Sequence, residues 1–226
     1  MAFFTQDFLD FFSELKENNH KDWFDEHRKR YLHTIKKPFE EFVDRMIDLI
    51  HEEDPQVMIA PKDAIFRINR DIRFSKDKRP YKENVSALIS PIGKKDKLTP
   101  GFYFELSPAA IGVYGGIYFT DKDTLSQIRH FMAADLPAFN RALYDKTFRE
   151  TYGEIHGDKH KRLPKDLQEP AKQQPLIFNK TFYYYTHLPA ANILADDLDE
   201  QLMELYRAGT PMKNYLTQAI GQPIDQ

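Results

Sequence analysis

The spacing of apolar residues along this chain changes from a helical period to a strand period and back again. In residues 1–55, Phe, Leu, Ile, Val and Met recur every three or four positions, as in amphipathic helices. Thr5 is a suitable N-cap for the first helix, and Pro38 is suited to the first turn of a later one. Asp54-Pro55 is expected to end that later helix. The pattern therefore predicts N-terminal helices over residues 1–55.

Apolar and polar positions alternate in the middle of the chain, where Ile, Val, Phe and Tyr are frequent. Such alternation predicts strands with one buried face. No helical crossover separates these strands, so we expect a mainly antiparallel sheet over residues 64–119. The expected strands are residues 64–74, 84–90, 101–107 and 111–119.

Helical spacing returns in residues 120–226, beginning at the candidate N-cap Thr120. Residues 152–175 are charged and irregular, the aromatic run of residues 176–187 is a candidate further strand, and two helices are expected after it. Helices, then a sheet, then helices is the order of an α+β fold. We therefore expect a single α+β domain over residues 1–226, with N-terminal and C-terminal helices packed on the central sheet.

The composition is that of an ordinary soluble globular protein, with 41% hydrophobic and 30% charged residues among 226. No window approaches the roughly 20 apolar residues of a membrane span, and the N-terminal residues lack the features of a secretory signal. The absence of cysteine excludes disulfides, thiolate metal sites and cysteine nucleophiles. We therefore expect a cytoplasmic protein that does not bind membranes. The sequence leaves its oligomeric state open.

Positive charge is concentrated in residues 67–82. This segment holds seven Lys or Arg against two Asp, a formal +5 in a chain whose total is −3. Apolar Phe66, Ile68, Ile72 and Phe74 alternate with polar residues, which predicts a strand with one buried and one polar face. The candidate ligand-binding residues are Arg67, Arg70, Asp71, Arg73, Lys76, Lys78, Arg79 and Lys82.

Clustered cations attract anions, and arginine binds phosphate or carboxylate through two parallel hydrogen bonds. The first hypothesis is therefore a site for a small anionic ligand, with Arg67, Arg70 and Arg73 as clamps. Whether the protein is an enzyme is left open, and the candidate proton handlers are His187, Tyr81 and Asp71.

Two alternatives use the same basic segment. The cations can pair with carboxylates of the chain itself, such as Asp71 and Asp77, in a structural ion-pair network, or form a docking surface for an acidic partner. The segment can also bind nucleic acid, with residues 75–82 contacting phosphates and Tyr183 or Tyr185 stacking on bases. Because the chain as a whole is acidic, nucleic acid is less favoured than a small anion.

Other patterns carry less chemistry. His156 and His160 have the i,i+4 spacing of a metal pair, but Gly153 and Gly157 argue against the helix that would align them, so we expect a surface loop and no metal. Gly112–Gly116 lies between strands rather than before a helix, so a bulge or a close backbone approach is expected instead of a phosphate loop. We see no motif for a cofactor.

The chain also resembles a known family. The resemblance is strongest in residues 70–82, RDIRFSKDKRPYK, which are similar to the signature of the family catalogued as domain of unknown function 2461. It implies a single intracellular α+β domain and brings no catalytic residues with it. The other matching positions are Asn18-Asn19, Trp23-Phe24, Tyr31, Gly115-Gly116, Leu125, Ile128-Arg129, Lys161–Lys165 and Pro211-Met212. Among them, Asn18, Asn19 and Trp23, together with His27, are candidates for a pocket wall or for core packing.

Overall fold

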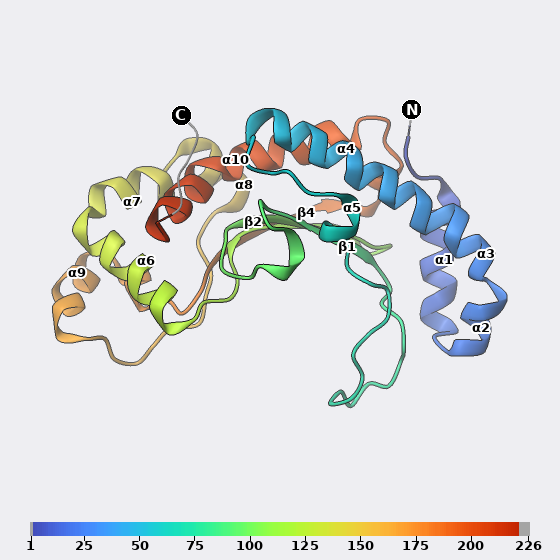
Figure 1. The fold of residues 1–226 in the computed structure, drawn as a ribbon, viewed down its shortest axis with the longest axis horizontal. Helices are drawn as coiled ribbons and strands as arrows, with labels where there is room; N and C mark the ends of the chain where they lie inside the picture. Colours follow the sequence, from blue (N-terminus) through green and yellow to red (C-terminus); the bar gives the residue numbers. More distant parts are fainter. Residues whose placement is uncertain (1, 222–226) are drawn as a thin grey trace. The chain divides into compact units, whose positions relative to one another are not determined.

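The computed structural model describes residues 2–221, which form helices and a four-stranded antiparallel sheet with the strand order β1-β2-β3-β4 (Figure 1). The α+β class expected from the change of period is confirmed. The strands are β1 Val85–Ile89, β2 Gly101–Leu106, β3 Ala110–Ile117 and β4 Phe182–Pro189. The helices are α1 Gln6–Glu17, α2 Lys21–Glu26, α3 Arg28–Arg30, α4 Lys37–Glu53, α5 Pro61–Ala64, α6 Lys122–Ala134, α7 Leu136–Leu143, α8 Lys146–Tyr152, α9 Gln168–Gln173 and α10 Leu198–Ala219.

The sheet differs from the expected one at its two edges. The strand predicted for residues 64–74 was wrong, since after α5 this segment makes only isolated bridges. Phe74, expected on its buried face, is 95% exposed. The fourth strand is β4, from the aromatic run late in the chain, and it pairs with β3. The sheet is therefore completed by a segment far away in sequence rather than by the segment that precedes β1.

The chain divides into two compact units, each built from several segments. Of the described residues, the first unit holds 2–94, 103–113 and 187–203, and the second holds 95–102, 114–186 and 204–221. The expectation of a single domain stays a prediction. Within residues 2–221, no helix is both long and apolar enough to cross a membrane.

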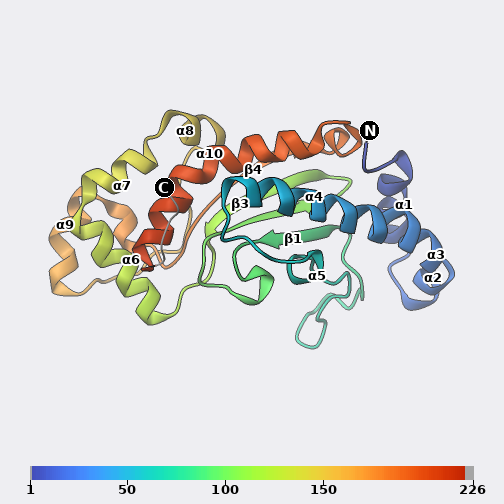
Figure 2. The same ribbon diagram turned by 45° about the horizontal axis from the view of Figure 1, so that its top comes forward.

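In the first unit, α4 covers one face of the sheet (Figure 2). Phe39 and Phe42 of this helix contact Phe104 of β2, with ring centroids 6.1 and 5.8 Å apart. Burial alternates along β2, so that Phe104 is buried while Tyr103 and Glu105 are partly exposed. Since successive side chains of a strand point to opposite faces, Tyr103 and Glu105 lie on the face away from α4.

The N-terminal helices begin and end close to the expected residues. Thr5 is the N-cap of α1, although its side chain makes no capping hydrogen bond. Pro38 lies in the first turn of α4, but the chain is already helical before it, through a π-helical stretch of residues 31–36. The C-cap of α4 is Asp54, as predicted.

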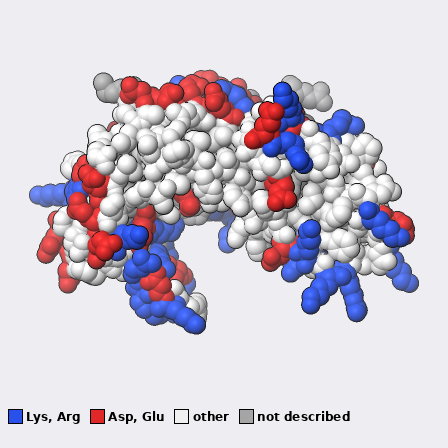
Figure 3. All heavy atoms as spheres, turned by 180° about the vertical axis from the view of Figure 1, so that it is seen from behind, with Lys and Arg blue, Asp and Glu red and all other residues white. Residues whose placement is uncertain are grey.

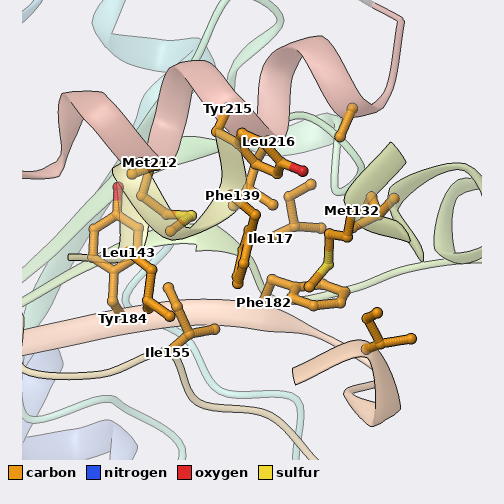
Figure 4. Close-up of a cluster of buried hydrophobic side chains, with 14 of the residues drawn as sticks. Ile117, Met132, Phe139, Leu143, Ile155, Phe182, Tyr184, Met212, Tyr215 and Leu216 are labelled. Atoms are coloured by element: carbon orange, nitrogen blue, oxygen red, sulfur yellow. The ribbon is translucent and has the colours of Figure 1, made fainter. Parts of the chain in front are cut away.

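In the second unit, three consecutive helices are capped by aspartates. Asp121, Asp135 and Asp145 each accept a backbone N–H at the start of α6, α7 and α8, so the cap expected at Thr120 lies one residue later. The C-terminal part is one continuous helix, α10, with Pro211 inside it, instead of the two expected. These helices enclose an apolar cluster that includes Ile117, Met132, Phe139, Phe182, Met212 and Leu216 (Figure 4).

Candidate functional site

Residues 65–84 form a projecting segment, drawn in teal below β1 in Figure 1, which we call the arm. Its halves pair antiparallel through two bridges, Ile65 with Ala87 and Asn69 with Tyr81. Between the two bridges the chain advances by four residues from Ile65 to Asn69, but by six residues from Tyr81 to Ala87. The second side therefore holds two extra residues, and the chain bends there, at Glu83 and Asn84. A bulge of this kind interrupts the ladder of hydrogen bonds. The alternating pattern is therefore present, but no regular strand forms.

The outer part of the arm is held by ion pairs among its own side chains. Asp77 lies at their centre, since its carboxylate accepts from Arg70 at 2.7 Å and from Arg79 at 2.8 Å. Arg79 also pairs with Glu83. The hydrogen bonds from Arg79, and after them the one from Arg70, hold the pKa of Asp77 far below its usual range. These ion pairs add to the backbone link across the arm, where the Arg70 N–H donates to the Pro80 carbonyl oxygen and the Lys82 N–H to that of Ile68, each at 2.8 Å.

The three arginines expected as clamps are not brought together on one strand face. Arg70 is engaged by Asp77, and Arg73 forms a two-pronged pair with Asp71 at 3.0 and 2.7 Å. Arg67 has no carboxylate within 4 Å among residues 2–221. Arg70 and Arg73 therefore have the partners that an ion-pair network requires, and Arg67 does not.

The end of the arm is exposed and cationic. Figure 3 shows Lys and Arg side chains gathered on it, at the lower left. Lys76 and Lys78 are exposed there, and Lys78 Nζ donates to the carbonyl oxygen of Ile72 at 2.9 Å. The guanidinium of Arg73 lies 5.9 Å from the ring centroid of Phe74. These candidates face solvent, and no hydrogen bond or ion pair joins Lys76 to them within the described chain.

The base of the arm is fastened to the N-terminal helices. The side-chain amide of Asn19 donates to the Tyr81 carbonyl oxygen at 3.0 Å and accepts from the Tyr81 N–H at 3.1 Å. The buried Tyr81 ring stacks on Phe24 of α2, with centroids 4.0 Å apart. The rings of Trp23 and His27, which are close to Phe24 in the sequence, stack on each other with centroids 4.1 Å apart. Among the candidate pocket-wall residues, Asn19 therefore anchors the arm, whereas Trp23 and His27 contact each other.

Next to this anchor, the arm brings together two cations and part of β2, a group that we call the arm-base cluster. It consists of Phe66, Arg67 and Lys82 from the arm, Asn84 after it, and Tyr103 and Glu105 from β2. The Lys82 Nζ lies 5.3 Å from the ring centroid of Phe66, and the Phe66 and Tyr103 rings are 5.9 Å apart. Glu105 Oε2 accepts from the Tyr103 hydroxyl at 3.0 Å and from the Asn84 amide at 3.4 Å.

Lys82 is the partly buried cation of this cluster. Burial lowers the pKa of its ammonium, the carboxylate of Glu105 opposes that effect, and the positive charge of Arg67 adds to it. Two like charges are therefore held near each other at a site where Glu105 is already engaged by two donors. Such a site favours an incoming anion.

The candidate proton handlers lie elsewhere. Tyr81 is in the aromatic anchor, Asp71 is exposed and paired with Arg73, and His187 is exposed on β4. Tyr103 and Glu105 of the arm-base cluster were not among the site residues expected from the sequence. The sequence does contain a pattern that points to them, because polar-tipped residues that alternate with buried Phe on a strand mark the face away from the core.

The aromatic run of β4 belongs to the second unit up to residue 186. Phe182 and Tyr184 are buried, whereas Tyr183 and Tyr185 are partly exposed, because successive side chains of a strand point to opposite faces. Tyr183 and Tyr185 continue a row of rings, which we call the tyrosine row: Tyr118 lies 5.2 Å from Tyr183, Tyr183 lies 6.4 Å from Tyr185, and Tyr185 lies 5.7 Å from Tyr114 and 4.7 Å from His156. Tyr118 is 77% exposed.

The histidine pair does not form a helical metal motif. His156 makes a β-bridge with Tyr183, and the segment that leads on to His160 is extended. In the part of the chain that the structure describes, no three His, Asp or Glu side chains gather as metal ligands would. The glycine-rich stretch has the expected close approach, since a Cβ on Gly116 would lie 2.3 Å from the Phe182 carbonyl oxygen.

Comparison with known proteins gives one match. The chain matches the family described as conserved hypothetical protein (DUF2461) over residues 7–215. No curated protein matches, and no solved structure matches. The match includes the arm, its anchor on α2, and β2 with the arm-base cluster. With this coverage, the chain belongs to the DUF2461 family.

Proposed function

We propose that this protein binds a small ligand bearing a phosphate or carboxylate group at the arm-base cluster, with Arg67 and Lys82 as the cationic contacts. The observation that carries the proposal is geometric: the Lys82 ammonium lies 5.3 Å from the Phe66 ring, which packs on Tyr103, and Lys82 has no carboxylate within 4 Å among the described residues. Burial lowers the pKa of this ammonium, Glu105 opposes the effect, and the positive charge of Arg67 adds to it. An anion beside both groups removes this repulsion and forms charge-assisted hydrogen bonds with each. Arg67 is the arginine of the arm that is not already held by a carboxylate among the described residues.

The neighbours of these cations favour an anion with a flat or apolar body. Phe66 and Tyr103 form an edge-to-face pair beside Lys82, which offers ring surface to a ligand. Glu105 accepts from the Tyr103 hydroxyl and the Asn84 amide, which holds both in place as polar contacts. The remaining cations of the arm surround the site at longer range and attract anions to it. A cytoplasmic location stays a prediction.

The test is a thermal-shift screen followed by calorimetry with ATP, AMP, glucose 6-phosphate and citrate. We expect a ligand from this set to bind the wild type, and to bind the Arg67→Gln/Lys82→Gln variant at least about tenfold more weakly, because two charge-assisted hydrogen bonds are lost. The control is Lys76→Gln/Lys78→Gln, which removes the same charge from the end of the same arm. An equal loss of affinity in both double variants would show that binding depends only on the overall positive charge of the arm. Equal affinity in the wild type and in both variants would place the ligand site elsewhere.

A second function, the binding of single-stranded nucleic acid, is supported by the tyrosine row. Partly exposed rings in succession offer bases a stacking surface, and every base has a face that can use it. The cations of residues 75–82 belong to the first unit and are not part of this surface. We rank this function second because the chain has a formal charge of −3.

Fluorescence anisotropy with a labelled oligo-dT tests this second function. Binding through phosphates weakens steeply between about 50 and 200 mM salt. We expect Tyr118→Ala to lose about 1–3 kcal/mol of binding free energy, the value of one stacked base. The control is Tyr144→Ala, because Tyr144 is 61% exposed but lies outside the row, at the end of α7. Absence of binding even at low salt removes this function.

A further inference from the structure

The end of the arm carries an almost fully exposed phenylalanine. Phe74 is 95% exposed, more than any other large apolar side chain among residues 2–221. It lies in a turn in which the Ser75 N–H donates to the Ile72 carbonyl oxygen at 3.3 Å, on a segment that projects away from β1 (Figures 1 and 2). Single exposed apolar residues are common on protein surfaces, so the role of Phe74 depends on its surroundings.

The turn that carries Phe74 is held by polar contacts on both sides. Before it, Asp71 accepts from the backbone N–H of Arg73 at 3.3 Å and from its guanidinium at 3.0 and 2.7 Å. After it, the Lys78 Nζ donates to the Ile72 carbonyl oxygen at 2.9 Å. Because these contacts restrict the turn while the Phe74 ring stays in water, less conformational freedom is lost when a partner buries the ring.

Positive charge surrounds this ring. Residues 70–79 hold five Lys or Arg and two Asp, a formal net charge of +3, and Figure 3 shows Lys and Arg gathered at the end of the arm. Both aspartates are engaged by arginines of the arm, whereas Lys76 and Lys78 are exposed and have no carboxylate within 4 Å among the described residues. Charges further away than about 10 Å are screened at 0.1 M salt, so this end attracts anions although the whole chain is acidic.

The small size of the arm end distinguishes between two kinds of anionic partner. A protein interface of standard size takes about 20–30 residues from each side, far more than residues 70–79 supply. A lipid surface requires no matching shape, because an apolar side chain enters the interface while cations stay at the level of the phosphate groups. An exposed ring beside two unpaired lysines fits this layering.

We propose that the end of the arm binds the surface of an anionic membrane, with Phe74 entering the interface and Lys76 and Lys78 contacting lipid phosphates. The expectation that the protein does not bind membranes came from the lack of a spanning segment and of a secretory signal, and a surface contact requires neither. Each lysine near an anionic surface strengthens binding about fivefold, and burial of the ring adds about tenfold. This contact does not depend on the ligand site proposed at the arm-base cluster.

Co-sedimentation of the full chain with vesicles is the first test. The vesicles consist of phosphatidylcholine alone, or of an equal mixture of phosphatidylcholine and phosphatidylglycerol. We expect binding to the mixed vesicles that weakens as salt is added, and much weaker binding to the neutral ones, because the lysines find no net negative charge there. Equal binding to both kinds of vesicle overturns the proposal. Absence of binding to the mixed vesicles at low salt also overturns it and leaves the arm end to a protein partner.

Charge variants locate the contact. Lys76→Gln/Lys78→Gln should bind the mixed vesicles about 30-fold more weakly, because two phosphate contacts are lost. The control is Lys36→Gln/Lys37→Gln, which removes the same charge from two exposed lysines where α4 begins, and it should change binding little. All four side chains are exposed, so we expect both variants to fold. Equal losses of affinity in the two variants would show that only the net charge of the chain matters and would overturn the proposal.

The aromatic ring is tested separately. Phe74→Ser should weaken binding to the mixed vesicles about tenfold, whereas Met58→Ser should not, although Met58 is 80% exposed in the same unit. Since the chain has one tryptophan, Phe74→Trp in a Trp23→Phe background places a single fluorophore at the arm end. We expect the emission of this variant to shift to shorter wavelength on the mixed vesicles. An unshifted emission from vesicle-bound protein would show that position 74 stays in water and would overturn the proposal.

Discussion

The anchor between Asn19 and Tyr81 makes the sharpest stability prediction, because one side chain makes two hydrogen bonds to the C=O and the N–H of one buried residue, at 3.0 and 3.1 Å. The substitution Asn19→Ala removes both. A net contribution of about 0.5–1.5 kcal/mol for each hydrogen bond gives a loss of about 1–3 kcal/mol. The upper end is expected, because the N–H and C=O of buried Tyr81 then lack partners.

Urea unfolding followed by circular dichroism measures this loss, and hydrogen exchange of the Tyr81 N–H locates it. For a chain of this size, roughly 2–4 °C per kcal/mol converts the loss to a melting temperature lowered by about 2–12 °C. The matched control is Asn18→Ala, since the Asn18 amide makes a single exposed hydrogen bond to the Glu14 carbonyl oxygen at 2.9 Å. Equal unfolding free energies for the two variants, with Tyr81 exchange unchanged, would refute the anchor.

Two further predictions concern the second unit. Gly116 has φ of +90° and a Cβ added to it would lie 2.3 Å from the Phe182 carbonyl oxygen, whereas Gly153 has φ of +75° and open space around it. We expect Gly116→Ala to destabilise the protein by about 2–4 kcal/mol and Gly153→Ala by about 1 kcal/mol in thermal unfolding, because only the first adds a steric clash to the backbone strain; similar losses would contradict the close approach. For His130, the Ser126 carbonyl oxygen and then Asp166 raise the imidazole pKa above 6.5, so the stabilisation is complete below that value and is lost as the pH rises through the raised pKa. An NMR titration should show this pKa falling toward 6.5 in Asp166→Asn, and an unchanged pKa would contradict the pairing.

Local pattern was enough to predict the class of the fold and most of its strands. The period of apolar residues depends on the geometry of the local backbone, so it correctly located the strands that begin at residues 85, 101 and 110. The same reasoning gave the aromatic run of residues 176–187 as a candidate strand, and β4 begins within it. It failed at residues 64–74, because alternation shows which side chains can share a face but does not show whether a partner in register exists.

The site depended on tertiary structure. Each arginine of the arm has several carboxylates near it in the sequence. The path of the folded backbone decides that Arg70 pairs with Asp77 and that Arg67 lies near Lys82. The contact of Asn19 with Tyr81 joins residues 62 apart, and that of Arg129 with Asn179 joins residues 50 apart. Local sequence determines periods and caps over a few residues. Contacts at such separations, and the charges they leave unpaired, are determined only when the whole chain has folded.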